Sequence, residues 1–365
     1  MSYKVIVVDD SAFMRSEIKK IIEEDSSLTV IATAKNGVEA IDLVKQLHPD
    51  VVTMDINMPK MDGITALERI MSESPCPVVM ISALTHENAE ETITALSLGA
   101  FDFFQKPSGS ISLDISIQAR AIREKILAAA RVKKDQYIKK NPIKNLQKKI
   151  STVAKLQNAI KIPRKFRATK NGSIVAVGVS TGGPRALMSI LPQIPAGFHG
   201  SIVIAQHMPE KFTLSFAKRL DGICHLKVKE AKDGEILQIG RIYIAPGGKH
   251  IRISKNNNNL FFIDVLDGTL SNTYTPSVDI LFRSLLEISG NQWLGIMLTG
   301  MGSDGAQALS DLRKIGGHTI AESEESCVVY GMPRRVIEMN GAEFILNESQ
   351  IANKIVELIG SSGCL

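Results

Sequence analysis

Short apolar runs alternate with helical patterns over residues 1–130. The runs KVIVV, VVTMD, PVVMIS and FDFF are separated by segments in which apolar residues recur every third or fourth position, as in Met14, Ile18, Ile21 and Ile22. Alternating strand and helix patterns are typical of a parallel sheet with helices on both faces. We therefore expect a doubly wound α/β domain over residues 1–125.

A second alternating pattern begins near residue 171. The strand-like runs SIVAVGVS and SIVIAQHM come first, and the shorter runs RIYIAP, HIRIS and LFFIDVL follow. After them come the helical segment VDILFRSLLEI and the apolar run WLGIMLTG. This order predicts a second doubly wound α/β domain, with a β-hairpin insertion, over residues 171–365.

A basic segment separates the two predicted domains. Residues 131–170 contain 14 Lys or Arg and one Asp, a net charge of +13, whereas the whole chain carries +5. The rest of the chain is therefore acidic. A basic stripe can bind nucleic acid or anionic lipid, but this segment has few aromatic residues and no recognised nucleic-acid-binding motif. We predict a solvated basic linker over residues 126–170 and no nucleic-acid partner.

Neither a membrane segment nor a structural role for the cysteines is indicated. No apolar run approaches the roughly 20 residues that span a bilayer, and the N-terminus does not resemble a signal peptide. We expect a cytoplasmic protein without membrane insertion. The four cysteines, which lack CxxC spacing, indicate neither a disulfide framework nor a zinc site; they are Cys76, Cys224, Cys327 and Cys364.

Polar residues follow the predicted strands of the first domain. Because the carboxyl ends of parallel strands meet at one edge of a sheet, we expect these residues to converge there. Three carboxylates suit a hard divalent cation, and a lysine and a hydroxyl would help to neutralise a phosphoryl group. The residues at these strand ends are Asp9, Asp10, Asp55, Ser82 and Lys106.

The same stretches resemble a known family. VVDDSAFMR, MDINMPKMDG, VVMISAL and LGAFDFFQKP are similar to the response-regulator receiver domain, a flavodoxin-like fold. The resemblance extends over residues 1–125 and implies phosphorylation that requires Mg²⁺. It implies Asp55 as phospho-acceptor, Asp9, Asp10, Asp55 and the main-chain carbonyl of Asn57 as metal ligands, Ser82 as the switch hydroxyl and Lys106 as the phosphate contact.

The motif GVSTGGP in the second domain allows two interpretations. It satisfies G-x-S-x-G and lies between a predicted strand and a predicted helix, which is the context of a nucleophile elbow around Ser180. Gly182 and Gly183 could instead offer backbone N–H groups to a phosphate at a helix N-terminus. The second reading is weaker, because no dinucleotide or P-loop fingerprint is present and no acidic residue ends the following strand.

A nucleophilic serine needs a base and an acid that orients the base. His207 follows the run SIVIAQ, and Asp304 follows the run WLGIML, so both are expected at the same sheet edge as Ser180. His250, after APGGK, is a second candidate for the base. The remaining histidines are expected at the opposite edge of the sheet or near helix ends and turns.

These residues lie in motifs that resemble a second family. GVSTGGP, QHMPEKFT, IAPGGKH, PSVDILF, LTGMGSDGA and ESCVVYGMP are similar to the catalytic domain of the CheB family of chemotaxis methylesterases and glutamine deamidases. One departure is Thr275, where an arginine is common in the family. The resemblance implies Ser180 as nucleophile, His207 as base, Asp304 as orienter, and Thr181 and the Met301 N–H as oxyanion donors.

The resemblance also implies a substrate and partners. The substrate would be a glutamate γ-methyl ester or a glutamine on a methyl-accepting chemoreceptor, releasing methanol or ammonia, with no cofactor in the catalytic domain. A chemotaxis histidine kinase would be the phosphodonor, and the unphosphorylated receiver would occlude Ser180. Two alternatives stay open: a non-enzymatic output domain, for which no helix-turn-helix signature is present, and a serine hydrolase of small esters, which only a substrate test separates.

Overall fold

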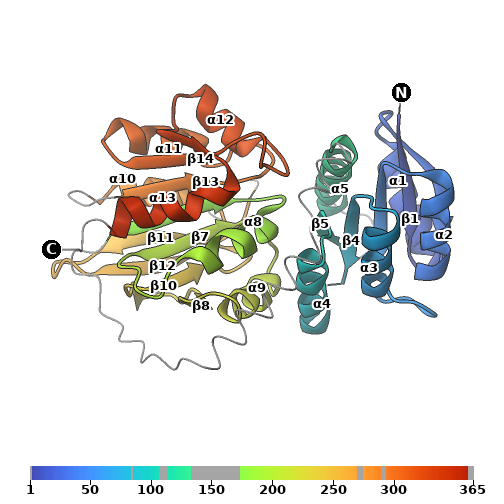
Figure 1. The fold of residues 1–365 in the computed structure, drawn as a ribbon, viewed down its shortest axis with the longest axis horizontal. Coiled ribbons are helices and arrows are strands. Elements are labelled where there is room, and N and C mark those ends of the chain that lie inside the picture. The colour runs from blue at the N-terminus through green and yellow to red at the C-terminus, as the bar shows by residue number, and fades with distance from the viewer. Residues whose placement is uncertain are drawn as a thin grey trace. The chain divides into compact units, whose positions relative to one another are not determined.

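Two separate parallel sheets organise the chain (Figure 1). The computed structural model describes residues 2–83, 85–106, 113–132, 173–268, 274–288 and 293–360. It divides into two units, Met1–Leu146 and Gln147–Leu365. The expected linker lies mostly outside the described residues. Among the described residues, no helix combines the length and apolar character that a membrane span requires.

The N-terminal unit is a five-stranded parallel sheet in the order β2-β1-β3-β4-β5. Its central strands are apolar on both faces and completely buried, as expected for a sheet covered by helices on both sides. The elements are β1 (Tyr3–Val8), α1 (Ala12–Glu23), β2 (Leu28–Ala34), α2 (Gly37–Leu47), β3 (Val51–Asp55), α3 (Gly63–Glu73), β4 (Val78–Ser82), α4 (His86–Ser97), β5 (Asp102–Gln105) and α5 (Leu113–Arg131).

Side-chain caps fix where the first four helices begin. In each case the side-chain oxygen of the preceding residue accepts a backbone N–H from the first turn, which typically contributes about 1 kcal/mol. Helix α5 continues to Arg131, past the expected domain end at residue 125. The capping residues are Ser11, Asn36, Asp62 and Thr85.

The C-terminal unit is a seven-stranded parallel sheet in the order β15-β14-β13-β6-β7-β10-β8. Helices α8 and α13 pack together, and α10 packs against α11; Figure 1 shows α13 crossing in front of the strands. The elements are β6 (Ile174–Val179), α8 (Gly183–Ile190), η1 (Leu191–Gln193), β7 (Ser201–Gln206), α9 (Phe212–Asp221), β8 (Lys227–Glu230), β10 (Arg241–Ile244), α10 (Val278–Leu286), β13 (Trp293–Met297), α11 (Ala306–Lys314), β14 (His318–Glu322), α12 (Met332–Glu338), β15 (Phe344–Leu346) and α13 (Glu348–Gly360).

The strand order reverses at β6, which pairs with β7 on one side and β13 on the other. At such a switch point the loops that leave the carboxyl ends of the strands diverge and leave room for a ligand. The loops after β6, β7 and β13 carry Ser180, His207 and Asp304, so the topology brings the three predicted residues to one place.

A small antiparallel sheet is the predicted insertion. Strands β11 (Lys249–Lys255) and β12 (Phe261–Asp267) form a hairpin, and β9 (Glu235–Ile236) pairs with β12. The run RIYIAP, grouped by its sequence with these short strands, instead forms β10 of the main parallel sheet. Its residues Ile242, Tyr243 and Ile244 are completely buried. A run this short does not by itself predict a strand in the centre of a sheet.

Candidate active site

Ser180 lies in a tight turn between β6 and α8. Its N–H donates to the Thr299 carbonyl at 3.0 Å, and its own carbonyl accepts from the Gly183 N–H at 2.8 Å. Gly182 has φ +79, which glycine adopts without strain. A Cβ at Gly183 would lie 2.2 Å from Oε1 of Gln206. Gly182 is therefore required by the turn that presents Ser180, and Gly183 by the close approach of the Gln206 side chain.

His207 begins the loop after β7 and meets Ser180 through its ring. The His207 Nδ1 lies 3.0 Å from Ser180 Oγ. The Gln206 side-chain amide donates to the carbonyl of Ser180 at 3.0 Å and to that of His207 at 3.1 Å. Gln206, which is buried, thus holds the serine loop and the histidine loop together. This glutamine was not predicted from the sequence.

Asp304 completes a line of three side chains. Its Oδ2 lies 2.8 Å from His207 Nε2. The carboxylate also accepts from Ser277 Oγ at 3.0 Å and from the N–H groups of Val278 at 2.7 Å and Asp279 at 3.1 Å. Ser277 is the N-cap of α10, so Asp304 sits at a helix N-terminus, where a negative charge is favoured.

The environment keeps the Asp304 carboxyl ionised. Burial raises its pKa, but the hydrogen bond and charge of His207 and the two backbone N–H groups outweigh burial, and the pKa of Asp304 falls below its usual value. The His207 and Asp304 side chains are only 9% and 10% exposed. Since water screens such a pair little, the carboxylate can stabilise a positive charge on the histidine ring.

The line of atoms fits acyl transfer by a serine. With the ring proton on Nε2, facing Asp304, the Nδ1 lone pair faces the Ser180 hydroxyl and can accept its proton. A base within hydrogen-bond reach of the nucleophile, itself oriented by an acid, is the arrangement that activates a serine.

Two further residues were predicted to face the reacting carbonyl. Thr181 is buried, and its carbonyl accepts from the Thr299 hydroxyl at 3.0 Å. Met301 follows Gly300, where a Cβ would lie 2.8 Å from the Ser180 Cβ. The loop that carries Met301 therefore runs directly beside Ser180. The Ser180 N–H is already donated to Thr299, so it is engaged within the protein.

A buried carboxylate supports this loop from behind. Glu322, at the carboxyl end of β14, is completely buried. Its Oε2 accepts the Thr299 N–H at 2.8 Å, and its Oε1 accepts from Ser326 Oγ at 2.9 Å. Glu322 thus fixes Thr299, which in turn contacts Ser180 and Thr181. Its position at a strand end was the sequence signal that could have revealed it.

His250, the second candidate for the base, has another role. It is completely buried on β11, and its Nδ1 accepts the Ser277 N–H at 3.1 Å. Burial lowers the pKa of His250. In the described part of the chain, Ser180 is hydrogen bonded to the ring of His207 and not to that of His250.

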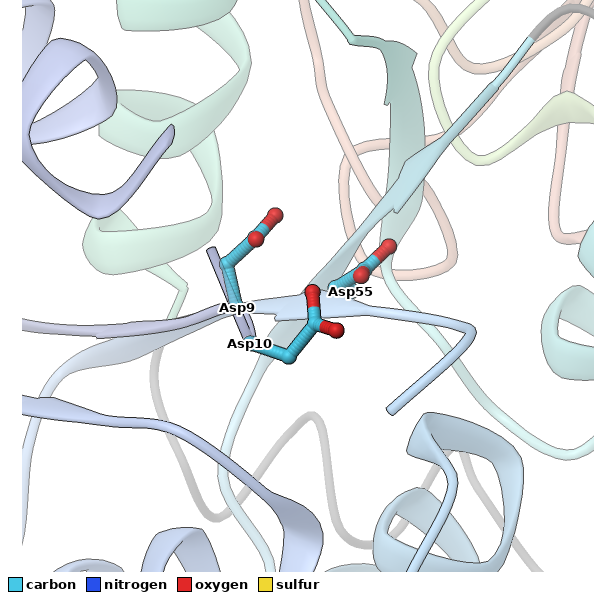
Figure 2. A group of neighbouring side chains, drawn as sticks. All are labelled: Asp9, Asp10 and Asp55. Atoms are coloured by element: carbon cyan, nitrogen blue, oxygen red, sulfur yellow. The ribbon is translucent and has the colours of Figure 1, made fainter. Parts of the chain in front are cut away.

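The N-terminal unit gathers a separate acidic cluster. Carboxylate oxygens of Asp9, Asp10 and Asp55 all lie within 4.8 Å of one another, and Figure 2 shows them at the ends of β1 and β3. Lys106 Nζ lies 2.9 Å from Asp55 Oδ2 and 3.1 Å from Asp9 Oδ2. Three clustered carboxylates form the hard oxygen donor set that Mg²⁺ prefers, so the residues fit this ion.

The electrostatics of the cluster centre on Asp55. Burial, together with the charge of Asp9 and against the opposing effect of Lys106, raises the pKa of Asp55 to about 6. Burial lowers the pKa of Lys106, but its two carboxylate partners raise it further, and the net pKa lies above the usual lysine value. A cation at the cluster would remove the repulsion between the carboxylates.

Ser82 and Asn57 make contacts with α4. Ser82 Oγ accepts from the Thr92 hydroxyl at 2.8 Å, and the Asn57 side chain donates to Asn88 Oδ1 at 2.9 Å. No hydrogen bond joins Ser82 Oγ to the Asp55 carboxylate among the described residues. The predicted switch hydroxyl is thus tied to α4 in this structure.

Comparison with known proteins agrees with both halves of this description. A family model described as "CheB methylesterase" matches residues 175–355, and one described as "Response regulator receiver domain" matches residues 5–118. A protein-glutamate methylesterase/protein-glutamine glutaminase 2 of Carboxydothermus hydrogenoformans is 44% identical over 98% of this chain and 99% of its own length. A similarly named protein of Caldanaerobacter subterraneus is 44% identical over 98% of this chain and 96% of its own length.

A solved structure agrees with the C-terminal fold. The crystal structure of the Thermotoga maritima CheB methylesterase catalytic domain is 42% identical and covers 52% of this chain and all of its own, with a TM-score of 0.50. Both predicted fold classes are confirmed. Because its relatives match it along almost its whole length, the chain belongs to the CheB family of protein-glutamate methylesterases and protein-glutamine glutaminases that carry a receiver domain.

Proposed function

We propose that Ser180, His207 and Asp304 form the catalytic triad of this methylesterase and glutaminase. The proposed substrates are γ-methyl glutamate esters and glutamine side chains of methyl-accepting chemoreceptors. The observation that carries the assignment is the continuous line from Ser180 Oγ through both ring nitrogens of His207 to Asp304, with contacts of 3.0 and 2.8 Å.

The reaction follows from this line. Ser180 Oγ attacks the γ-carbonyl carbon while His207 Nδ1 takes the hydroxyl proton. His207 then returns the proton to the leaving group, so that methanol departs from an ester and ammonia from an amide. Water repeats the same steps on the glutamyl-enzyme, which releases glutamate and restores the Ser180 hydroxyl.

The negative charge on the attacked carbonyl oxygen needs donors. We assign this role to the main-chain N–H of Met301 and to Thr181, because both lie in the two loops that border Ser180. The engaged Ser180 N–H supports a donor from outside the nucleophile residue. Removing one such donor typically lowers kcat by about 10²–10³.

We assign regulation to the receiver. Asp55 is the proposed phospho-acceptor, and a chemotaxis histidine kinase is the proposed donor. The residues that would hold Mg²⁺ are Asp9, Asp10, Asp55 and the carbonyl of Asn57, and the bound ion would supply positive charge at the incoming phosphoryl group. Lys106 contacts Asp55 already, and Ser82 would exchange Thr92 for the phosphoryl oxygen.

The proposed domain boundaries differ from the sequence prediction only at the end of the receiver. We propose a receiver that includes α5 as far as Arg131, a basic linker and a catalytic domain over residues 171–365. With these proposed partners we infer a cytoplasmic enzyme that binds no nucleic acid.

Methanol release from methylated receptor tests the triad and the substrate together. Ser180→Ala and His207→Ala are each expected to lose several orders of magnitude in kcat, and the double variant should lose little more, since both residues act in one step. Ser189→Ala, on α8, is the matched control and should keep normal turnover. Normal methanol release by His207→Ala would contradict the assignment. Hydrolysis of small acetate esters without receptor demethylation would be consistent with the triad but would refute the proposed receptor substrate.

A further inference from the structure

Tyr274 stacks on the ring of His207. The two ring centroids lie 4.5 Å apart and the ring planes differ by only 2°. The neighbouring Thr275 departs from the family pattern, but no role for this tyrosine was predicted from the sequence. Nothing in the triad itself requires an aromatic ring at this place, so the contact calls for an explanation.

The tyrosine belongs to the segment that also anchors the acid of the triad. Three residues later, Ser277 donates its hydroxyl to Asp304, and Val278 donates its N–H to the same carboxylate. A Cβ built on Gly302 would lie 3.2 Å from the Tyr274 hydroxyl. The tyrosine therefore reaches from the histidine ring to the loop that carries Met301.

Stacking restricts a rotation that would break the triad. Both ring nitrogens of His207 are used within the ring plane, by Ser180 and by Asp304. Rotation about the Cβ–Cγ bond would move both nitrogens off their partners. A flat ring parallel to the imidazole blocks that rotation, because the turning edge would collide with it.

Stacking also matters when the ring becomes charged. In the acyl-transfer step His207 takes a proton and becomes an imidazolium, and the negative face of an aromatic ring attracts a cation within about 6 Å of its centroid. A neutral imidazole gains much less from this field. The contact is therefore stronger in the transition state than in the resting enzyme, which is the condition for faster turnover.

Resting on the proposed triad, we propose that Tyr274 is a positioning residue for the methylesterase reaction, whose ring holds His207 in plane and stabilises its protonated form. The ring is required and the hydroxyl is not. Tyr274→Phe retains the π face, and Tyr274→Leu retains apolar bulk without one.

The test compares these two variants of the full chain in methanol release from methylated receptor across pH. Tyr274→Phe should match wild type within about twofold. Tyr274→Leu should lose about five- to thirtyfold in kcat, the range of a partly desolvated cation–π contact, with little change in KM. The low-pH midpoint of its kcat/KM profile should move down by about one pH unit, because the protonated ring has lost a stabilising partner. A thermal melt of each variant checks that it folds.

Three outcomes would overturn the inference. The first is a wild-type kcat in folded Tyr274→Leu, and the second is a loss of kcat that is equal in Tyr274→Phe and Tyr274→Leu. The third is a rise in the KM of Tyr274→Leu without a change in kcat, which would assign the ring to receptor binding. Failure of the triad is separable from all three, because it appears as residual turnover in Ser180→Ala whatever stands at position 274.

Discussion

Replacing Asp304 with asparagine isolates the charge of the triad acid. The carboxylate accepts four hydrogen bonds: Oδ2 from His207 and the Val278 N–H, and Oδ1 from Ser277 Oγ and the Asp279 N–H. An asparagine can keep its oxygen toward His207 and turn its NH₂ toward Ser277. The serine hydroxyl can then accept instead of donate, and only the Asp279 N–H loses its acceptor. We therefore expect His207 to keep its proton on Nε2.

The expected loss then follows from charge alone. Two unit charges about 4 Å apart in a site with an effective dielectric constant of about 20 attract by about 4 kcal/mol. Losing that attraction in the transition state costs about 10²–10³ in kcat. Where the amide also forces the wrong tautomer, the loss is about 10⁴. Asp304→Asn should therefore lose less than Ser180→Ala.

The assay is methanol release from methylated receptor, with kcat and KM determined separately. Asp311→Asn is the matched control, since Asp311 on α11 bonds only Gln307 and Lys314 among the described side chains. It should leave both constants unchanged. A loss of 10⁴ or more in Asp304→Asn would refute the proposed reorientation of Ser277, and unchanged kcat would refute the role of the carboxylate.

Three further predictions concern the receiver and the buried support. Acetyl phosphate with Mg²⁺ should label Asp55 and stimulate methanol release by the full chain, and Asp55→Ala or EDTA should abolish both, as mass spectrometry and the release assay would show. The pKa of Asp55 is raised from 3.8 to about 6 in the folded state. The ionised carboxylate therefore destabilises the fold at pH values above about 6, and this destabilisation is absent at pH values below about 4. Metal-free Asp55→Asn should therefore melt above metal-free wild type near neutral pH, and the gap should close as pH falls through about 6 toward about 4; a constant gap would count against this account. Glu322→Ala strands the Thr299 N–H and should lower the unfolding free energy by about 1–3 kcal/mol, which denaturant titration measures, with Glu322→Gln losing less.

Strand ends were readable from the sequence because apolar runs and the polar residues after them are local signals. Ser180, His207 and Asp304 were predicted to share an edge on that basis, and the structure brings them within hydrogen-bond reach. Strand order was not readable. The sequence grouped RIYIAP with the other short strands without saying which sheet it joins, because nothing local separates a short central strand from a short hairpin strand. Only pairing with β7 and β8 places it in the main sheet.

The supporting side chains were hidden for a different reason. The Gln206 amide bonds the carbonyl of Ser180, and the Ser277 hydroxyl bonds the carboxylate of Asp304. Both partners are distant in the sequence, and such bonds leave no periodic pattern. Tyr274 stacks on a ring 67 positions away in the sequence, as the residue numbers show. Glu322 alone had a local signal, since a carboxylate at the end of an apolar strand is costly to bury without partners.

Strand order also explains why this triad uses the histidine nitrogens in reverse of the usual serine-protease arrangement, where Nε2 faces the serine. The order is β13-β6-β7, so His207, directly after β7, is next to Ser180, directly after β6, but two strands from Asp304 after β13. Neighbouring strands lie about 4.8 Å apart, so the acid starts about twice as far from the histidine as the serine does. Nδ1, near the backbone, meets the near partner, and Nε2, at the far end of the ring, meets the distant one. An imidazole that spans two strands is fixed only by partners at both ends and along its face. The backbone at the start of α10 therefore holds Asp304, and the ring of Tyr274 lies flat against His207, for the same reason: both keep the imidazole in position.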